Sequence, residues 1–317
     1  MNNPFYAIAR QFRKKRDESR QTGYERKHDL LYKRHGAEKA IFIIFVVIFI
    51  VFAFTFIFPF FWLFFNSLKS PLEYAKSTMS MPNSWRWSNF EKALTYSSTD
   101  TNNYNLLQML WTSVLVAGGG TLATVITSSC AAWVVAKYKF PGRGLIFSVV
   151  IFSLIVPIVG SLPSQMQLMK TLGLTNTVIG VIFLYSGGFG TNFLLLYSFF
   201  KNLSWTYVEA AKIDGASDFR IFVQIVVPMA KGPMIAVGIL SLIGLWNDYL
   251  TPSIYLEGRP TISYGIYIMQ TSILNGGSAD YPLFFAMILI TVLPILIIFM
   301  IFNKTIMENT TVGGLKG

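Results

Sequence analysis

The sequence has 317 residues, of which 53% are hydrophobic and only 13% are charged. This charged share is about half that of ordinary soluble domains, which excludes a single water-soluble core and makes a lipid bilayer the expected solvent. The net charge of +11 would suit nucleic acid, but the basic residues stand between apolar stretches instead of forming one compact domain. We therefore expect no nucleic-acid partner.

The chain begins with a polar, basic segment, residues 1–39, which we interpret as a tail that orients the protein and contacts anionic lipid. The apolar run after it follows too long a polar lead to be a cleaved signal peptide. A membrane-spanning helix needs roughly 20 mostly apolar residues. On this basis we predict six spans, over residues 40–65, 107–136, 145–163, 178–200, 229–250 and 282–302.

Small and helix-breaking residues mark the middle spans. Gly118-Gly119-Gly120 lies in the second span, where small side chains favour close packing inside a helix bundle. Pro157 lies in the third span, and Gly187-Gly188 and Gly190 lie in the fourth; neighbouring helices can satisfy the backbone at such breaks. The apolar runs are continuous and do not alternate as barrel strands would. The predicted fold class is therefore an all-α polytopic membrane protein.

The distribution of basic residues predicts the orientation. The two tails and the loops 137–143 and 201–233 carry 20 of the 26 Lys and Arg residues, against six in the other three loops. Without the N-terminal tail the balance is still nine to six. By the positive-inside rule, both termini are then cytoplasmic. The predicted organisation is a tail, 1–39, a six-helix membrane domain, 40–303, with its core from about 107, and a cytoplasmic tail, 304–317.

The loop 201–233 holds the most specific pattern. Thr206 to Glu209 fits a capping box that starts a helix. Ala210 and Ala211 keep one face of that helix small, so that another surface could approach it. Gly215 supplies the conformational freedom for a sharp helix exit. A capped helix with a turn, and no partner, would also account for Glu209 and Asp214.

A second helix is expected directly after this exit. Ser217 can cap it, and Pro228 marks the return to the membrane. Its apolar face would be formed by residues at helical spacing, namely Phe219, Phe222 and Val223 or Val226. The loop is therefore predicted to be a helix–turn–helix lying under the bilayer.

This loop resembles the EAA motif of binding-protein-dependent ABC importer permeases. The matching positions are Glu209, Ala210, Ala211, Asp214, Gly215, Ala216 and Pro228. The resemblance implies a type I ABC importer permease fold, in which this segment is a coupling helix that docks in a groove of an ATPase subunit. It also implies two ATPase subunits, a second homologous permease subunit and an extracytoplasmic binding protein as partners. ATP and Mg would be bound by the ATPase, because this chain has no GxxxxGK[ST] loop.

Further segments are similar to the permease subunits of maltose-type importers, and the resemblance covers residues 40–317. These segments are Pro59, Trp62 and Asn66-Ser67-Leu68-Lys69, then Pro82 and Asn89-Phe90, and the span ending Trp246-Asn247-Asp248-Tyr249-Leu250. The C-terminal end, Gly313-Gly314-Leu315-Lys316-Gly317, is similar to a tail that reaches between the ATPase subunits; a solvated terminus is the alternative. Through Gly313, Gly314 and Lys316 this tail would contact the ATPase.

The cargo implied by this branch of the family is a sugar or oligosaccharide. Sugar sites combine aromatic side chains with neutral hydrogen-bonding groups, and the candidates for the pathway are Tyr185, Asn192, Trp246 and Asn247. Contact with lipid or the membrane interface is the alternative for each aromatic residue. The external segment 275–280 would contact the sugar-binding protein through Asn275, Gly276, Gly277 and Asp280, or would be a plain turn.

The sequence thus predicts a transporter subunit of the bacterial cytoplasmic membrane, not an enzyme. No catalytic motif is present, and the two histidines, His28 and His35, have no cluster of further metal ligands around them. The spans contain almost no ionisable residues, which disfavours a proton- or sodium-driven transporter. The alternatives are a permease of the same type for a peptide, amino acid or polyamine, and a membrane scaffold that transports nothing.

Overall fold

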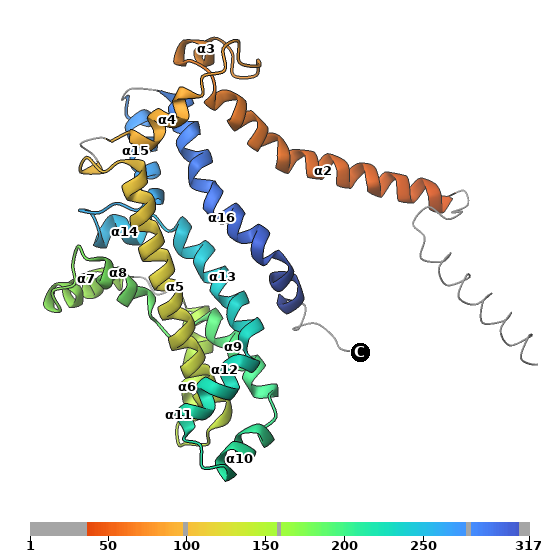
Figure 1. Ribbon diagram of the computed structural model, residues 1–317, viewed down its shortest axis with the longest axis vertical. Coiled ribbons are helices and arrows are strands. Elements are labelled where there is room, and N and C mark those ends of the chain that lie inside the picture. The colour runs from red at the N-terminus through yellow and green to blue at the C-terminus, as the bar shows by residue number, and fades with distance from the viewer. Residues whose placement is uncertain (1–36, 98–100, 157–159, 277–279, 311–317) are drawn as a thin grey trace, which may run out of the picture. The chain divides into compact units, whose positions relative to one another are not determined.

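The computed structural model describes residues 37–97, 101–156, 160–276 and 280–310, in which all regular structure is helical (Figure 1). The chain divides into two compact units, residues 1–61 and 62–317. The helices are, in chain order, α2 (Ala37–Ser67), α3 (Pro71–Lys76), α4 (Ser88–Thr95), α5 (Leu106–Lys137), α6 (Arg143–Ile155), α7 (Leu162–Thr171), α8 (Val178–Tyr185), α9 (Thr191–Asn202), α10 (Thr206–Ile213), α11 (Asp218–Ile221), a π-helical turn η2 (Phe222–Val226), α12 (Val227–Met229), α13 (Lys231–Asn247), α14 (Leu250–Tyr255), α15 (Ile262–Leu274) and α16 (Tyr281–Thr310).

The described part of the first unit, residues 37–61, belongs to α2. The stretch Glu38–Ser67 has 30 residues and a mean hydropathy of 3.3. At 1.5 Å per residue it is about 45 Å long, more than the roughly 30 Å of a bilayer core. Its apolar side chains are exposed, as Phe49 and Phe54 illustrate. The first predicted span is therefore confirmed as a helix able to cross a membrane.

In the second unit α5 is the central helix, and it packs against α8, α9 and α13. Glycine allows the close approach of α8, because an added Cβ at Gly119 would lie 2.5 Å from Ile182. At Gly120 it would lie 2.8 Å from both Tyr185 and a neighbouring leucine side chain. The predicted role of small residues inside a bundle is thus confirmed for these two glycines. Gly118 faces open space.

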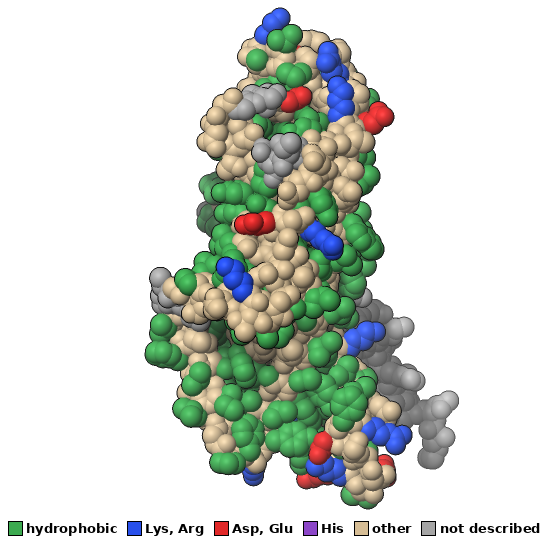
Figure 2. Space-filling model, turned by 90° about the vertical axis from the view of Figure 1, so that its left-hand side faces the viewer, with side chains coloured by type: hydrophobic (Ala, Val, Ile, Leu, Met, Phe, Trp, Pro, Cys, Tyr) green, Lys and Arg blue, Asp and Glu red, His purple; other side chains and the backbone are tan. Residues whose placement is uncertain are grey.

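Buried side chains in the second unit form three clusters. One surrounds Trp133 and Phe200 near α10, and another surrounds Met109 and Trp246 near α4. The third lies around Met169, between α5, α7, α8 and α14. In Figure 1, α10 and α4 lie at opposite ends of this unit. Figure 2 shows hydrophobic side chains over much of the face drawn, with charged side chains near both ends and a few between them.

The third and fourth predicted spans are not continuous helices. Instead of covering 145–163, helix α6 has 13 residues, which is about 20 Å and too short to cross alone. It ends because Val156 is extended, as expected for the residue before Pro157. The fourth span is divided into α8 and α9, and between them Gly190 has a φ of 138°, which only glycine adopts readily.

Three helices, α2, α5 and α16, are long and apolar enough to cross a membrane among the residues that the structure describes. The second and sixth predicted spans are therefore confirmed together with the first. Helix α13 corresponds to the fifth, and it reaches a crossing length only with the preceding segment Asp218–Met229, from which it is bent by 79°. We treat Asp218–Met229 as part of the loop because of this bend.

Buried polar contacts connect two sequence segments that are distant along the chain. Asn66, Ser67, Leu68 and Lys69 are all at most 1% exposed. The Asn89 side-chain amide donates to the carbonyl oxygens of Ser67 at 2.7 Å and of Lys69 at 2.9 Å. Lys69 Nζ donates to Asn66 Oδ1 at 2.9 Å. Asn89 thereby holds the turn that follows α2 against the start of α4.

Candidate functional site

The helical loop around α10 exposes apolar side chains. Ile213 is 86% exposed, Tyr207 is 50% exposed, and Ala210 between them is also exposed. These three residues are spaced three apart and share one side of the helix, which we call the exposed face of α10. The buried side holds Val208 and Ala211, which pack in the cluster around Trp133. An exposed apolar face at the tip of a loop is typical of a contact surface for another protein.

The start of α10 differs from the predicted capping box. The helix begins at Thr206 with Trp205 before it, and no side chain caps it. The backbone N–H of Thr206 is bonded instead to the hydroxyl of Ser204, at 3.3 Å. The Glu209 carboxylate is exposed and accepts no hydrogen bond within the described residues. It is therefore free to contact a partner, together with the exposed face.

The predicted sharp exit after α10 is confirmed. Gly215 has a φ of 79°, in the left-handed region that favours glycine. Its N–H donates to Lys212 O at 3.0 Å, and the N–H of Ala216 donates to Ala211 O at 3.0 Å. These two bonds form a Schellman motif, which satisfies the last carbonyl groups of the helix. Asp214, the last residue before the glycine, is exposed.

The second helix of the loop begins as predicted and buries part of the predicted apolar face. The Ser217 hydroxyl caps α11 by accepting from the N–H of Arg220, at 3.4 Å. Of the predicted face, Val226 is buried and Phe222 packs against the cluster around Trp133, whereas Phe219 is 77% exposed and Val223 is also exposed; Ile221 is buried in addition. The π-helical turn η2 adds one residue per turn here, so the apolar face follows a different register. Pro228 comes just after this turn, and the bend into α13 lies at Ala230.

A group of aromatic side chains joins the loop to the end of α5. Trp205 stacks on Trp133 with ring centroids 6.4 Å apart, and Tyr138 meets Trp205 edge-on at 5.9 Å. Trp133 also contacts Phe200 at 5.6 Å and Phe222 at 6.3 Å. We call these five residues the aromatic cluster. Because it joins α5, α9, α10 and η2, the loop and the central helix are expected to move together.

An ion pair holds the two helices of the loop together. Lys212 Nζ lies 3.1 Å from Asp218 Oδ1, and the Tyr138 hydroxyl donates to the same carboxylate at 2.9 Å. The hydrogen bonds from Lys212 and then from Tyr138 lower the pKa of Asp218. Lys212 Nζ also lies 6.0 Å from the ring centroids of Tyr138 and Trp205. The carboxylate therefore stays ionised at neutral pH and closes the turn at Gly215.

Sequence reasoning missed the aromatic cluster and this ion pair. Lys212 directly follows the two alanines of the motif, and Trp205 directly precedes α10. Both could have been noticed by their position. Trp133 and Tyr138 carry no such signal, because a tryptophan and a tyrosine at the end of a span are usual membrane-interface residues.

Two of the candidate pathway residues are half-buried and make polar contacts between helices. The Tyr185 hydroxyl donates to Asp248 Oδ2 at 2.9 Å, and Asp248 Oδ1 accepts the backbone N–H of Thr251 at 3.0 Å. The Asn192 amide donates to the Ser241 hydroxyl at 2.9 Å. The first contact joins α8 to the end of α13, and the second joins α9 to α13.

The other two pathway candidates have different surroundings. Trp246 is only 4% exposed, and its Nε1 donates to Thr291 O at 3.2 Å. In this structure the indole therefore packs between α13 and α16. Asn247 is exposed, and its amide donates to Ile243 O of its own helix at 2.8 Å. Its side chain can therefore contact a ligand only at the surface of this chain.

The remaining sequence predictions fall partly outside the described residues. Gly277, Gly313, Gly314 and Lys316 lie outside them, as does nearly all of the tail 1–39. Asn275 ends α15, and Gly276 follows with a φ of 86°. Asp280 accepts the N–H of Leu283 at 3.1 Å at the start of α16. A turn thus precedes the undescribed residues, and the capped start of α16 follows them.

Comparison with known proteins agrees with this architecture. A family model described as "Binding-protein-dependent transport system inner membrane component" matches residues 123–308. The diacetylchitobiose uptake system permease protein NgcG of Streptomyces coelicolor is 32% identical over 79% of this chain and 81% of its own length. The maltose/maltodextrin transport system permease protein MalG of Escherichia coli is 28% identical over 75% of this chain and 83% of its own.

A solved structure shares the fold. The crystal structure of a bacterial ABC transporter involved in the import of the acidic polysaccharide alginate contains a chain that matches with a TM-score of 0.67 and 22% identity. The match covers 86% of this chain and 99% of that one. From the family match, the relatives and this fold, we conclude that the chain belongs to the binding-protein-dependent transport system inner membrane components.

Proposed function

We propose that this chain is the permease subunit of an ATP-driven importer and forms half of the translocation pathway for a sugar or oligosaccharide. The functions of two relatives, diacetylchitobiose uptake and maltose or maltodextrin transport, support a saccharide as cargo. The chain works with a second homologous permease subunit, two ATPase subunits that bind ATP and Mg, and an extracytoplasmic sugar-binding protein.

The proposed arrangement has six crossings with both termini in the cytoplasm of a bacterial cell. Helices α2, α5 and α16 cross as single long helices, whereas α6, the pair α8–α9 and α13 form the third, fourth and fifth crossings as shortened or broken helices. Irregular backbone is tolerated at membrane depth where neighbouring protein or a water-filled cavity surrounds it. Such breaks are therefore compatible with helices that border a pathway.

One observation carries the proposal: the exposed face of α10 projects from a loop that is fixed to the central helix α5. Ile213, at 86% exposure, is the most exposed large apolar side chain among the described residues. An ATPase surface that covers it would remove this apolar area from water. Closure of the ATPase pair on ATP would then displace α10, and the aromatic cluster would transmit the movement to α5.

The motif residues then have separate roles in the proposed contact. Glu209 and Ala210 face the ATPase, while Ala211 lets α10 pack closely on the aromatic cluster. Asp214, Gly215 and Ala216 form the rigid turn, and Pro228 lies just before the bend into α13. Gly313, Gly314 and Lys316 would add a second contact with the ATPase.

Site-specific crosslinking tests this assignment in the assembled complex. The native Cys130 is exposed, so it is first replaced by serine, and single cysteines are then placed at Ile213 or at Met81. Met81 is a matched control because it is 75% exposed and lies between α3 and α4, near the opposite end. A thiol crosslinker should join residue 213, and not residue 81, to the ATPase. Capture of the ATPase from both positions or from neither would refute the proposed contact.

A further inference from the structure

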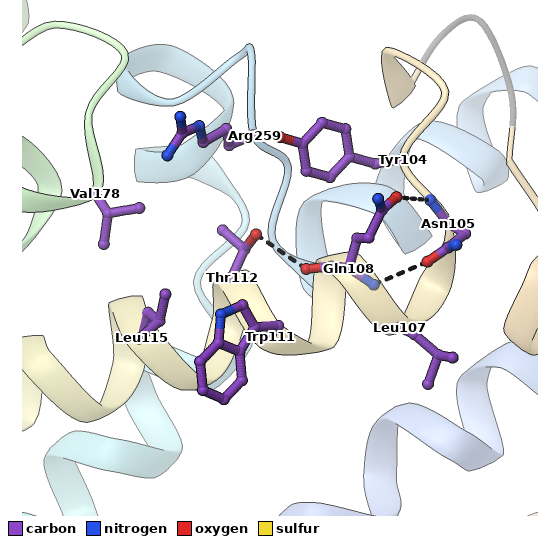
Figure 3. Close-up of a pocket in the computed structure, with 9 residues that line it drawn as sticks. All are labelled: Tyr104, Asn105, Leu107, Gln108, Trp111, Thr112, Leu115, Val178 and Arg259. Carbon is purple, nitrogen blue, oxygen red and sulfur yellow. Dashed lines mark hydrogen bonds between the residues drawn. The ribbon is translucent and has the colours of Figure 1, made fainter.

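A second surface lies in the half of the molecule near α4 and is not used by the proposed coupling contact. A groove of about 530 Å³ is lined by Tyr104, Asn105 and the first three turns of α5, by Val178 at the start of α8, and by Arg259 between α14 and α15 (Figure 3). This volume is in the range of small-molecule sites. In Figure 3 the Tyr104 hydroxyl is directed toward Arg259, and the Gln108 side chain rises from α5 below both.

The polar groups of this groove are mostly hydrogen-bond donors. Asn105 Oδ1 accepts the N–H of Gln108, and Gln108 Oε1 accepts the N–H of Asn105, both at 2.9 Å. This capping box uses the oxygen of each amide and leaves both NH₂ groups without a partner in the described chain. The indole N–H of Trp111 and the Arg259 guanidinium are likewise unbonded there. The groove therefore offers many donors and few acceptors.

The charge of the groove is positive. Arg259 lines it without an ion-pair partner, since the one ion pair among the described residues joins Lys212 and Asp218. No aspartate or glutamate lines the groove, although Glu257 lies two residues away in the chain. A guanidinium fits a carboxylate with two parallel hydrogen bonds. An anionic, acceptor-rich ligand is thus complementary to this surface.

Aromatic side chains add a flat apolar surface. Trp111 is 64% exposed at the groove. Tyr104 lines the opposite side of the groove, next to Asn105. Such rings combine a large apolar face with a polar edge, a combination suited to the C–H faces and hydroxyl groups of a sugar ring.

We propose that this groove is a contact site for the imported saccharide and that it favours a sugar bearing a carboxylate, which Arg259 binds. The proposal rests on the proposed function as a saccharide permease. It names the chemical class of the cargo and places a contact with this chain at residues other than the pathway candidates Tyr185 and Asn192.

Direct binding to the assembled transporter tests the groove independently of transport. The complex is placed in phosphatidylcholine nanodiscs without its sugar-binding protein. The Kd is then measured for a hexuronic-acid disaccharide and for the matching neutral hexose disaccharide. We expect the acidic disaccharide to bind about tenfold more tightly, as a charge-assisted hydrogen-bonded pair would give. Arg259→Gln should remove this preference, and Trp111→Ala should weaken both sugars about equally.

Arg86→Gln is the matched control, because Arg86 is an exposed arginine that does not line the groove. Equal affinity of the wild type for both disaccharides, or a preference that survives Arg259→Gln, would overturn the proposal. Loss of the second permease subunit or of bound anionic lipid in the Arg259 variant, with sugar binding unchanged, would also overturn it. If any of these results came with ATP-dependent uptake of neutral saccharide by the wild type, the groove proposal would be refuted and the proposed function as a saccharide permease would not. Failure to take up any saccharide would refute both.

Discussion

Replacing Gly215 by alanine isolates the contribution of the turn after α10. An alanine Cβ at this position would meet no atom within 4 Å, so the substitution introduces backbone strain without a steric clash. At a φ of 79° this strain is about 1–2 kcal/mol for an L-residue. A free energy of that size changes a local equilibrium by a factor of about 5–30. The open form of the turn should therefore become about 5–30 times more populated relative to the ordered form.

The assay is the number of saccharide molecules taken up per ATP hydrolysed by the complex in proteoliposomes. We expect Gly215→Ala to lower this ratio severalfold while ATP hydrolysis continues, because an open turn absorbs the movement of the ATPase. Gly215→Asn should lower it less, since asparagine tolerates the left-handed region.

Gly142→Ala is the matched control. Gly142 has a φ of 84°, an alanine Cβ there would also meet nothing within 4 Å, and the residue lies in the loop between α5 and α6. The two substitutions therefore impose the same backbone strain at different places. An equal fall in the ratio for both variants, or a normal ratio for Gly215→Ala, would refute the role of the turn in coupling.

Three further predictions concern packing, a buried hydrogen-bond group and pH. Trp246→Ala should destabilise the membrane domain by about 3–5 kcal/mol because the indole is buried, whereas Asn247→Ala should change stability by less than about 0.5 kcal/mol. Thermal unfolding in detergent compares the two variants, and equal losses of stability would contradict the packing role of Trp246. Asn89→Ala should cost about 1–3 kcal/mol, because the carbonyl groups of the preceding turn lose their donor; an unchanged melting temperature would contradict this. The pKa of Asp218 is lowered in the folded state, so the contribution of its carboxylate to stability is complete above the ordinary carboxyl pKa of about 3.9 and is lost only as pH falls through the lower folded value. The rate of limited proteolysis in the loop should therefore be constant from pH 8 to 5. Cleavage that increases over that interval would show that the ion pair with Lys212 does not hold the loop.

Long, uniformly apolar helices were predictable because their composition alone shows that they lie in a lipid bilayer. Helices α2 and α5 begin and end within three residues of the predicted spans, and α16 begins within one residue of its span but continues to Thr310. The third and fourth spans were less predictable. Hydropathy averages over a window, whereas α6 ends at the residue before one proline and α8 ends before a run of glycines. A hydropathy pattern therefore predicts one continuous helix where the structure has a helix broken at one or a few residues.

The candidate site was predictable where the backbone alone determines it. Gly215 requires a left-handed conformation, and Ser217 supplies a cap, so both were identified correctly. The capping box at Thr206 was wrong because Trp205 packs in the aromatic cluster and shifts the helix start. The predicted apolar face of the second helix was right for Phe222 and Val226 but wrong for Phe219, because the turn η2 departs from a period of 3.6 residues. Both errors arise from tertiary contacts that a local pattern does not contain.

The most direct test of the central claim is accumulation of a labelled oligosaccharide by proteoliposomes that contain this chain with its partner permease, ATPase and binding protein. The account predicts uptake only with ATP on the ATPase side and binding protein on the other. It also predicts loss of uptake in Ile213→Asp, which places a charge on the exposed face of α10 while the protein still inserts. Uptake that needs no ATP, or that continues unchanged in Ile213→Asp, would contradict the account.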